Sequence, residues 1–138
     1  MDQNPIRIIL VEDHELVRQS LRQLFRDLQQ FEVIADCGNG QDAVDLARRL
    51  RPDVMLVDVN MSPMDGFETT RHINEADPAV RVIGLSMNTQ PQYAQKMIQN
   101  GAMGYLTKSS PFHEILTAIE TVHSGEQYIC EEIRKKEA

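Results

Sequence analysis

Short apolar runs alternate along the chain with longer stretches in which apolar residues recur at helical spacing. Some runs, such as Ile8-Ile9-Leu10-Val11, lack the apolar–polar alternation of a half-exposed strand. This pattern is typical of strands buried on both faces of a parallel sheet. Strands are therefore predicted at residues 6–11, 32–37, 54–58, 80–86 and 104–107. Helices are predicted around residues 16–28, 43–50, 67–73, 93–98 and 112–122.

Five strands and five helices in strict alternation predict a doubly wound α/β sandwich with right-handed crossovers. The expected fold is a flavodoxin-like (βα)5 sandwich with a five-stranded parallel sheet in the order 2-1-3-4-5. One domain is expected over residues 5–125, because 138 residues leave little room for a second core. Residues 126–138 are dense in charge and lack apolar periodicity, which leaves open a fraying helix, a C-terminal tail or the start of a linker.

Charge and cysteine content narrow the class of protein. A net charge of −7 argues against binding of nucleic acid through the overall field of the domain. The sequence has no apolar stretch near the roughly 20 residues of a membrane span, so no membrane contact is expected. Cys37 and Cys130 lack the spacing of a metal site and are expected to be idle thiols in a reducing cytoplasm.

Polar residues follow four of the predicted strands directly, and ligands of open parallel sheets bind at that edge. These residues are Glu12-Asp13, Asp58, Ser86 and Thr107-Lys108. Three carboxylates close together repel one another unless a cation joins them, and oxygen ligands of this kind suit Mg²⁺. Lys108 offers a point charge for a phosphate, and Ser86 offers a hydroxyl donor. Each group alone is typical of an ordinary loop or helix cap, whereas the set in this order predicts a magnesium and phosphoryl site.

The same residues lie in segments that resemble the receiver domains of two-component response regulators. The resemblance runs from Ile6 to about Ser124, and it is specific only when the segments are taken together. The matching segments are 9–14 (ILVEDH), 57–61 (VDVNM), 64–66 (MDG), 83–86 (IGLS) and 101–108 (GAMGYLTK).

The resemblance implies a phosphoryl acceptor and a metal site. Asp58 is similar to the family's phosphoacceptor, which takes its phosphoryl group from a histidine of a partner sensor kinase. Glu12 and Asp13 resemble the acidic pair that serves Mg²⁺, with Asp13 expected to bind directly and Glu12 through water. Asn60 would add its backbone carbonyl. Such a domain catalyses only its own phosphorylation and dephosphorylation, so no enzyme activity toward other substrates is expected.

The resemblance also implies a switch. Lys108 would pair with the phosphoryl group, while Ser86 and Tyr105 resemble the switch hydroxyl and the switch aromatic. Movement of Ser86 toward the phosphoryl group would let the Tyr105 ring turn inward and alter the face of the domain that contacts its partners. A phosphorylation-dependent homodimer is among the expected partners. That face comprises residues 93–98, 104–107 and 112–122.

The residues 12–14 (EDH) and 101–109 resemble most the receivers that carry a helix-turn-helix DNA-binding output. DNA would then be contacted only through a domain absent from this sequence. The chain is either part of such a longer transcription regulator or a stand-alone receiver that acts by protein contact, and we expect the former.

Three positions depart from the family pattern or invite a different interpretation. Proline stands at 63 rather than 62, which predicts a differently shaped loop beside Asp58. Ser109 replaces the proline that often follows the lysine in a cis bond, so a trans Lys108–Ser109 bond is expected. His14 is expected to cap or pack at the start of the first helix rather than to bind metal.

Three other functions fit parts of the pattern less well. A haloacid-dehalogenase-type phosphohydrolase would need a second aspartate where Asn60 stands. A flavin-binding electron carrier would need a phosphate loop after residues 6–11, where Glu12 and Asp13 would repel the phosphate. A degenerate receiver used only for docking would not need the full acidic set together with Lys108.

Overall fold

The computed structural model describes residues 4–137 and contains one parallel sheet of six strands. The strand order is β2-β1-β3-β4-β5-β6, so the predicted order of the first five strands is confirmed. The sixth strand was not predicted. The strands are β1 (Ile6–Val11), β2 (Phe31–Cys37), β3 (Val54–Asp58), β4 (Arg81–Ser86), β5 (Gly104–Thr107) and β6 (Tyr128–Ile129).

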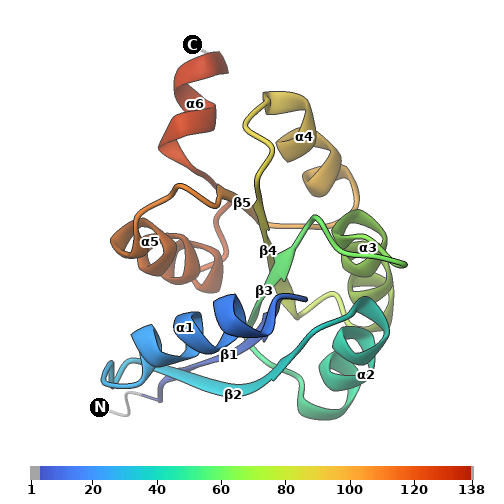
Figure 1. Cartoon of the computed structure of the whole chain (residues 1–138), viewed down its shortest axis with the longest axis vertical. Coiled ribbons are helices and arrows are strands. Elements are labelled where there is room, and N and C mark those ends of the chain that lie inside the picture. Colours follow the sequence, from blue (N-terminus) through green and yellow to red (C-terminus); the bar gives the residue numbers. More distant parts are fainter. Residues whose placement is uncertain (1–3, 138) are drawn as a thin grey trace.

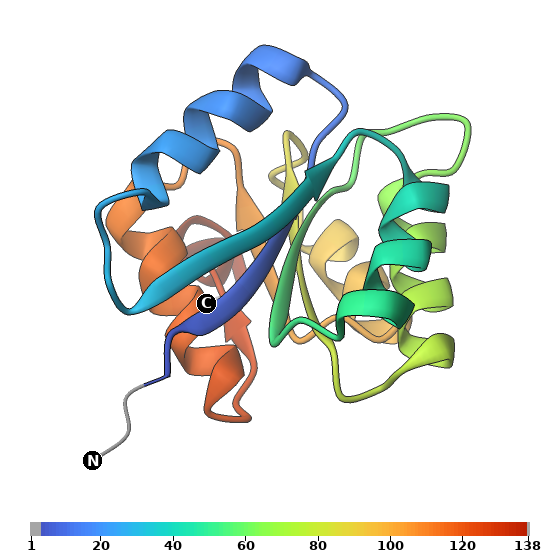
Figure 2. The same cartoon turned by 90° about the horizontal axis from the view of Figure 1, so that it is seen from below.

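Helices cover both faces of the sheet. In Figure 1, α1 and α5 lie on one side, and α2, α3 and α4 lie on the other. Figure 2 shows the same layers from below, with the sheet between the α1–α5 pair and the α2–α3 pair. The helices are α1 (Glu15–Phe25), α2 (Gly40–Leu50), α3 (Gly66–Ala76), α4 (Pro91–Gln99), α5 (Phe112–His123) and α6 (Glu131–Glu137). None of the helices within residues 4–137 is long and apolar enough to pass through a bilayer.

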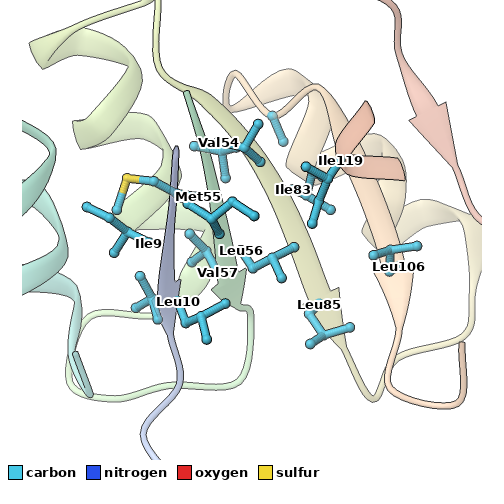
Figure 3. Close-up of a cluster of buried hydrophobic side chains, with 14 of the residues drawn as sticks. Ile9, Leu10, Val54, Met55, Leu56, Val57, Ile83, Leu85, Leu106 and Ile119 are labelled. Atoms are coloured by element: carbon cyan, nitrogen blue, oxygen red, sulfur yellow. The ribbon is translucent and has the colours of Figure 1, made fainter. Parts of the chain in front are cut away.

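The central strands form the core of the sandwich, because helices bury both of their faces. The run from Val54 to Val57 in β3 is at most 2% exposed, and its neighbours in the sheet are β1 and β4. Figure 3 shows these side chains packed with Ile9, Ile83 and Ile119. Burial on both faces explains why the strand sequence is apolar throughout.

Local signals fix the ends of the helices. The Asn39 side chain accepts a hydrogen bond from the backbone N–H of Asp42 and caps α2, and Asp65 caps α3 in the same way through Glu68. Gly101 has a φ of 107° just after α4, a left-handed conformation that glycine adopts without strain. The Asn100-Gly101 pair therefore ends α4 as predicted.

Residues 126–137, where a tail or linker was expected, add a strand and a helix to the domain. Strand β6 pairs in parallel with β5, and α6 lies beside α4 (Figure 1). Cys130 and Ile133 are fully buried and belong to the hydrophobic core. Lys136 Nζ donates a hydrogen bond to the carbonyl of Thr89, 2.9 Å away in the loop before α4. This segment therefore extends the sheet at its β5 edge and packs next to α4.

Candidate functional site

The predicted site residues meet at the carboxyl edge of the sheet. Asp58 ends β3 and Ser86 ends β4, while Glu12 follows β1 and Lys108 follows β5. Backbone hydrogen bonds between neighbouring strand ends hold two of them in place. The N–H of Glu12 donates to the carbonyl of Cys37 at 3.0 Å, and that of Lys108 donates to the carbonyl of Ser86 at 2.8 Å.

Gly66, the first residue of α3, lets the start of this helix approach the end of β3. Its N–H donates to the carbonyl of Val59 at 3.0 Å. A Cβ at this position would lie 2.6 Å from the carbonyl oxygen of Asp58 and 2.4 Å from the Cα of Val59. A larger residue would push the helix away from the site, so Gly66 has a positional role beside Asp58.

Four side chains form a compact cluster of candidate metal ligands. One ligand atom from each of Glu12, Asp13, His14 and Asp58 lies within 4.8 Å of the others. Glu12 and Asp58 are buried, at 1% and 2% exposure, whereas Asp13 and His14 are exposed. The sequence prediction that the acidic residues converge is therefore met by the geometry. The close grouping of three carboxylates at a partly buried edge is the arrangement that a hard cation stabilises.

Lys108 offsets only part of this negative charge. Its Nζ lies 2.8 Å from Glu12 Oε1 and 3.4 Å from Asp58 Oδ1. Burial acts to lower the pKa of Lys108, but the hydrogen bond to Glu12 and the charge of Asp58 outweigh it and raise that pKa. Burial acts to raise the pKa of Glu12, but hydrogen bonds from Lys108 and His14 hold it below its usual value. Glu12 and Lys108 therefore form an ion pair in which both groups are charged.

Asp58 has the opposite balance. Burial, and secondarily the charge of Glu12, raise the pKa of Asp58, although the N–H of Asn60 and Lys108 act to lower it. Asp58 Oδ2 is buried and has no hydrogen-bond partner among the described residues. A buried carboxylate oxygen without a donor is costly. These two observations fit a Mg²⁺ site, because a cation beside Oδ2 would satisfy this oxygen and lower the pKa of Asp58.

Asn60 takes part in the site through its side chain as well as its backbone. Its N–H donates to Asp58 Oδ1 at 3.0 Å. Its Oδ1 accepts from Ser86 Oγ at 3.4 Å and from the N–H of Met87 at 3.2 Å. The sequence pointed only to the backbone carbonyl of Asn60. The role of the side chain depends on the approach of two strand ends, which no local pattern encodes.

A chain of hydrogen bonds continues from Ser86 to Tyr105. Ser86 Oγ accepts from the N–H of Asn88 at 2.9 Å, and the Tyr105 hydroxyl donates to the carbonyl of Asn88 at 2.8 Å. The Tyr105 ring is fully buried, and this burial raises the pKa of its hydroxyl. The inward ring position expected after phosphorylation is therefore already occupied in this structure. The two proposed switch residues are joined through a single intervening residue.

Two further polar residues approach the site, and sequence reasoning did not assign them there. His14 is the N-cap of α1 but makes no side-chain cap; its Nδ1 lies 3.1 Å from both Glu12 Oε2 and Asp13 Oδ1. The hydrogen bond to Glu12 raises the pKa of His14. Glu132 of α6 accepts hydrogen bonds from Thr107 at 2.6 Å and Ser109 at 2.9 Å, on either side of Lys108.

The Lys108–Ser109 bond is trans, as expected. Within the described residues, Ser62–Pro63 is the cis peptide bond, and it lies in the loop after Asp58.

Comparison with known proteins identifies the same kind of domain that the site residues indicate. A sequence model described as the response regulator receiver domain matches residues 8–120. The chain belongs to the response-regulator receiver family. Receivers generally bind Mg²⁺ in an acidic pocket, and the cluster around Asp58 has that composition.

The chain is similar in sequence to the receiver parts of longer response regulators. The response regulator UvrY of Escherichia coli (strain K12) is 37% identical over 133 residues, which are 96% of this chain and 61% of UvrY. The transcriptional regulatory protein DegU of Brevibacillus brevis is 34% identical over 129 residues, which are 94% of this chain and 55% of DegU. The receiver thus spans little more than half the length of these relatives.

A solved structure supports the fold over nearly the whole chain. A LuxR-family two-component response regulator from Aurantimonas sp. SI85-9A1 aligns with a TM-score of 0.91 at 34% identity. The match covers 95% of this chain and 94% of that one. Two-component signalling and transcription regulation fit the relatives of this receiver.

Proposed function

We propose that the receiver accepts a phosphoryl group on Asp58 from a phosphohistidine of a partner sensor kinase in the cytoplasm. A carboxylate oxygen of Asp58 would form a bond to phosphorus, and the phosphorus–nitrogen bond to the histidine would break. The histidine nitrogen would keep the electron pair of that bond. Water would later release phosphate and restore the carboxylate. These reactions on its own side chain are the only chemistry proposed for the domain.

The chain's own residues would position and neutralise the group. Lys108, now paired with Glu12 and Asp58, provides a positive charge within reach of a phosphoryl oxygen. Asp13, Asp58 and the backbone carbonyl of Asn60 would hold Mg²⁺ directly, and Glu12 would act through water. When bound, Mg²⁺ supplies positive charge that offsets the carboxylates and the phosphoryl oxygens.

The output would leave through α4, β5 and α5. Support comes from the continuous hydrogen bonds between Ser86, Asn88 and Tyr105, which connect the acceptor edge to β5. A change on that face would select a partner, such as a second phosphorylated copy. In a longer regulator of the UvrY or DegU type, a DNA-binding part outside this chain would then control transcription.

One observation carries this proposal: the buried Oδ2 of Asp58 has no hydrogen-bond partner within residues 4–137 and lies beside the acidic pair and Lys108. Incubation with acetyl phosphate and Mg²⁺ is expected to add one phosphoryl group, seen as a mass increase of the intact protein. The same incubation with EDTA in place of Mg²⁺ is expected to leave the mass unchanged. Equal labelling with and without the metal would argue against a metal-assisted acceptor.

Replacement of Asp13 by alanine is expected to remove the stabilisation of the fold by Mg²⁺. A tenfold excess of Mg²⁺ over its Kd stabilises the parent by about 1.4 kcal/mol, which corresponds to a rise in Tm of roughly 4 °C for a domain of this size. In Asp13→Ala, this rise should vanish, while the metal-free Tm equals or exceeds that of the parent because one repelling charge is gone.

Thermal melting with and without Mg²⁺ measures both effects. Asp45→Ala is a suitable control, since Asp45 is an exposed aspartate of α2 outside the cluster. It should keep the full metal-dependent rise. An undiminished rise in Asp13→Ala would show that Asp13 does not bind the metal directly.

A further inference from the structure

Two donors at the end of β4 converge on one oxygen of Asn60. Ser86 Oγ lies 3.4 Å from Asn60 Oδ1, and the backbone nitrogen of Met87 lies 3.2 Å from the same atom. Asn60 is also bound to the acceptor, since its N–H donates to Asp58 Oδ1 at 3.0 Å. A single residue thus contacts the acceptor carboxylate and occupies two donors next to it.

An amide oxygen and a phosphoryl oxygen can accept hydrogen bonds from the same two donors, because each has two or more lone pairs. The phosphoryl oxygen carries charge, so its hydrogen bonds are shorter and about twice as strong as those of a neutral amide. Lys108 shows the same pattern, because its Nζ is held 2.8 Å from Glu12 Oε1. In the resting receiver, the donors around Asp58 are therefore already bound to the chain's own acceptors.

We propose that the Asn60 side chain is a resting-state stand-in for a phosphoryl oxygen. It holds Ser86 and Met87 and must be displaced when Asp58 is phosphorylated. This inference rests on the proposed function of Asp58. Asn60 is exposed, so its side chain can rotate into solvent, whereas Ser86 is fully buried at the end of β4, where its hydroxyl can turn to the new acceptor.

Displacement of the Asn60 side chain would act on the contacts from Ser86 to Tyr105 as well as on the affinity for a phosphoryl group. Ser86 Oγ also accepts from the N–H of Asn88, whose carbonyl binds the Tyr105 hydroxyl. When Ser86 exchanges the amide oxygen for a charged oxygen, the position of Asn88 changes with it. Asn60 is therefore a positioning residue that sets the threshold for the switch.

A purely structural brace would behave differently. Removal of a brace would loosen the loop after β4 and weaken binding of a phosphoryl group. Removal of a stand-in frees the two donors and strengthens binding, because no internal hydrogen bond has to be broken first. The Asn60→Ala variant keeps the backbone N–H and carbonyl of residue 60, so it separates the two roles.

The test compares the parent with Asn60→Ala by ¹⁵N NMR, using beryllofluoride as a phosphoryl mimic at a fixed Mg²⁺ concentration. Before the mimic is added, the amide proton of Met87 should move upfield in Asn60→Ala, since its acceptor is gone. Titration should then show about five- to tenfold tighter binding than in the parent, the worth of about one ordinary hydrogen bond. The control variant Asn74→Ala, which removes an asparagine side chain within α3, should bind the mimic as the parent does.

Three results would overturn the inference. An unchanged Met87 amide resonance would show that Asn60 does not hold this donor in solution. Equal or weaker mimic binding by Asn60→Ala, with a melting curve like that of the parent, would identify a brace instead. Absence of mimic binding by the parent itself would overturn the proposed function of Asp58 and the stand-in together.

Discussion

In the Asp58→Asn variant, phosphoryl uptake from acetyl phosphate is expected to fall to zero. An asparagine at this position keeps the shape of the side chain and an oxygen for the N–H of Asn60, which now lies 3.0 Å from Asp58 Oδ1. It lacks the anionic oxygen that bonds to phosphorus. Glu12 cannot take over, because it is committed to the ion pair with Lys108 at 2.8 Å.

Intact-mass measurement of the parent and Asp58→Asn in the same buffer with acetyl phosphate and Mg²⁺ shows whether each takes up a phosphoryl group. Asp45→Asn makes the same change of charge and size on the exposed face of α2 and should label fully. Uptake by Asp58→Asn at the level of the parent would place the acceptor elsewhere.

Ser86→Ala is expected to accept the phosphoryl group but to lose most of the response in α4, β5 and α5. The hydroxyl of Ser86 joins Asn60 Oδ1 to the N–H of Asn88, and alanine breaks this link. A hydrogen bond to a charged group contributes about 1.5–3 kcal/mol. Loss of that contribution would reduce the population of the switched state by roughly ten- to a hundredfold. Tyr105 would then keep the contact with Asn88 that it makes in this structure.

Amide chemical shifts with and without beryllofluoride measure this response. Ser20→Ala on the exposed side of α1 is the matched control and should respond as the parent does. Full shifts across α4 to α5 in Ser86→Ala would exclude this serine from the output path. Shifts confined to the surroundings of Asp58 in the parent would exclude the path altogether.

Most of the fold was predictable because the strands of a doubly wound sheet have an unusual sequence. Residues 54–57 are apolar at every position, since helices bury both faces of β3. The acidic pair, Asp58, Ser86 and Lys108 were found from their places at strand ends, and parallel strands bring such ends to one edge. These predictions needed only local sequence and the topology that alternation implies.

What was missed depends on contacts that lack a local signal. Strand β6 has two residues, and α6 has Ile133 as its one buried residue, so neither has enough apolar positions to show a period. The contacts of the Asn60 and Glu132 side chains join residues 23 to 27 positions apart in the chain. Such pairings are set by how the strand ends and α6 pack, which only the folded structure shows.

Chemical mapping of the phosphoryl group tests the central claim most directly. Borohydride reduces an acyl phosphate to the alcohol, which converts a phosphorylated aspartate to homoserine and leaves free carboxylates unchanged. After labelling with acetyl phosphate and Mg²⁺, peptide sequencing by mass spectrometry should find homoserine at position 58. An intact Asp58 with the modification at Asp13 or at another carboxylate would contradict the account.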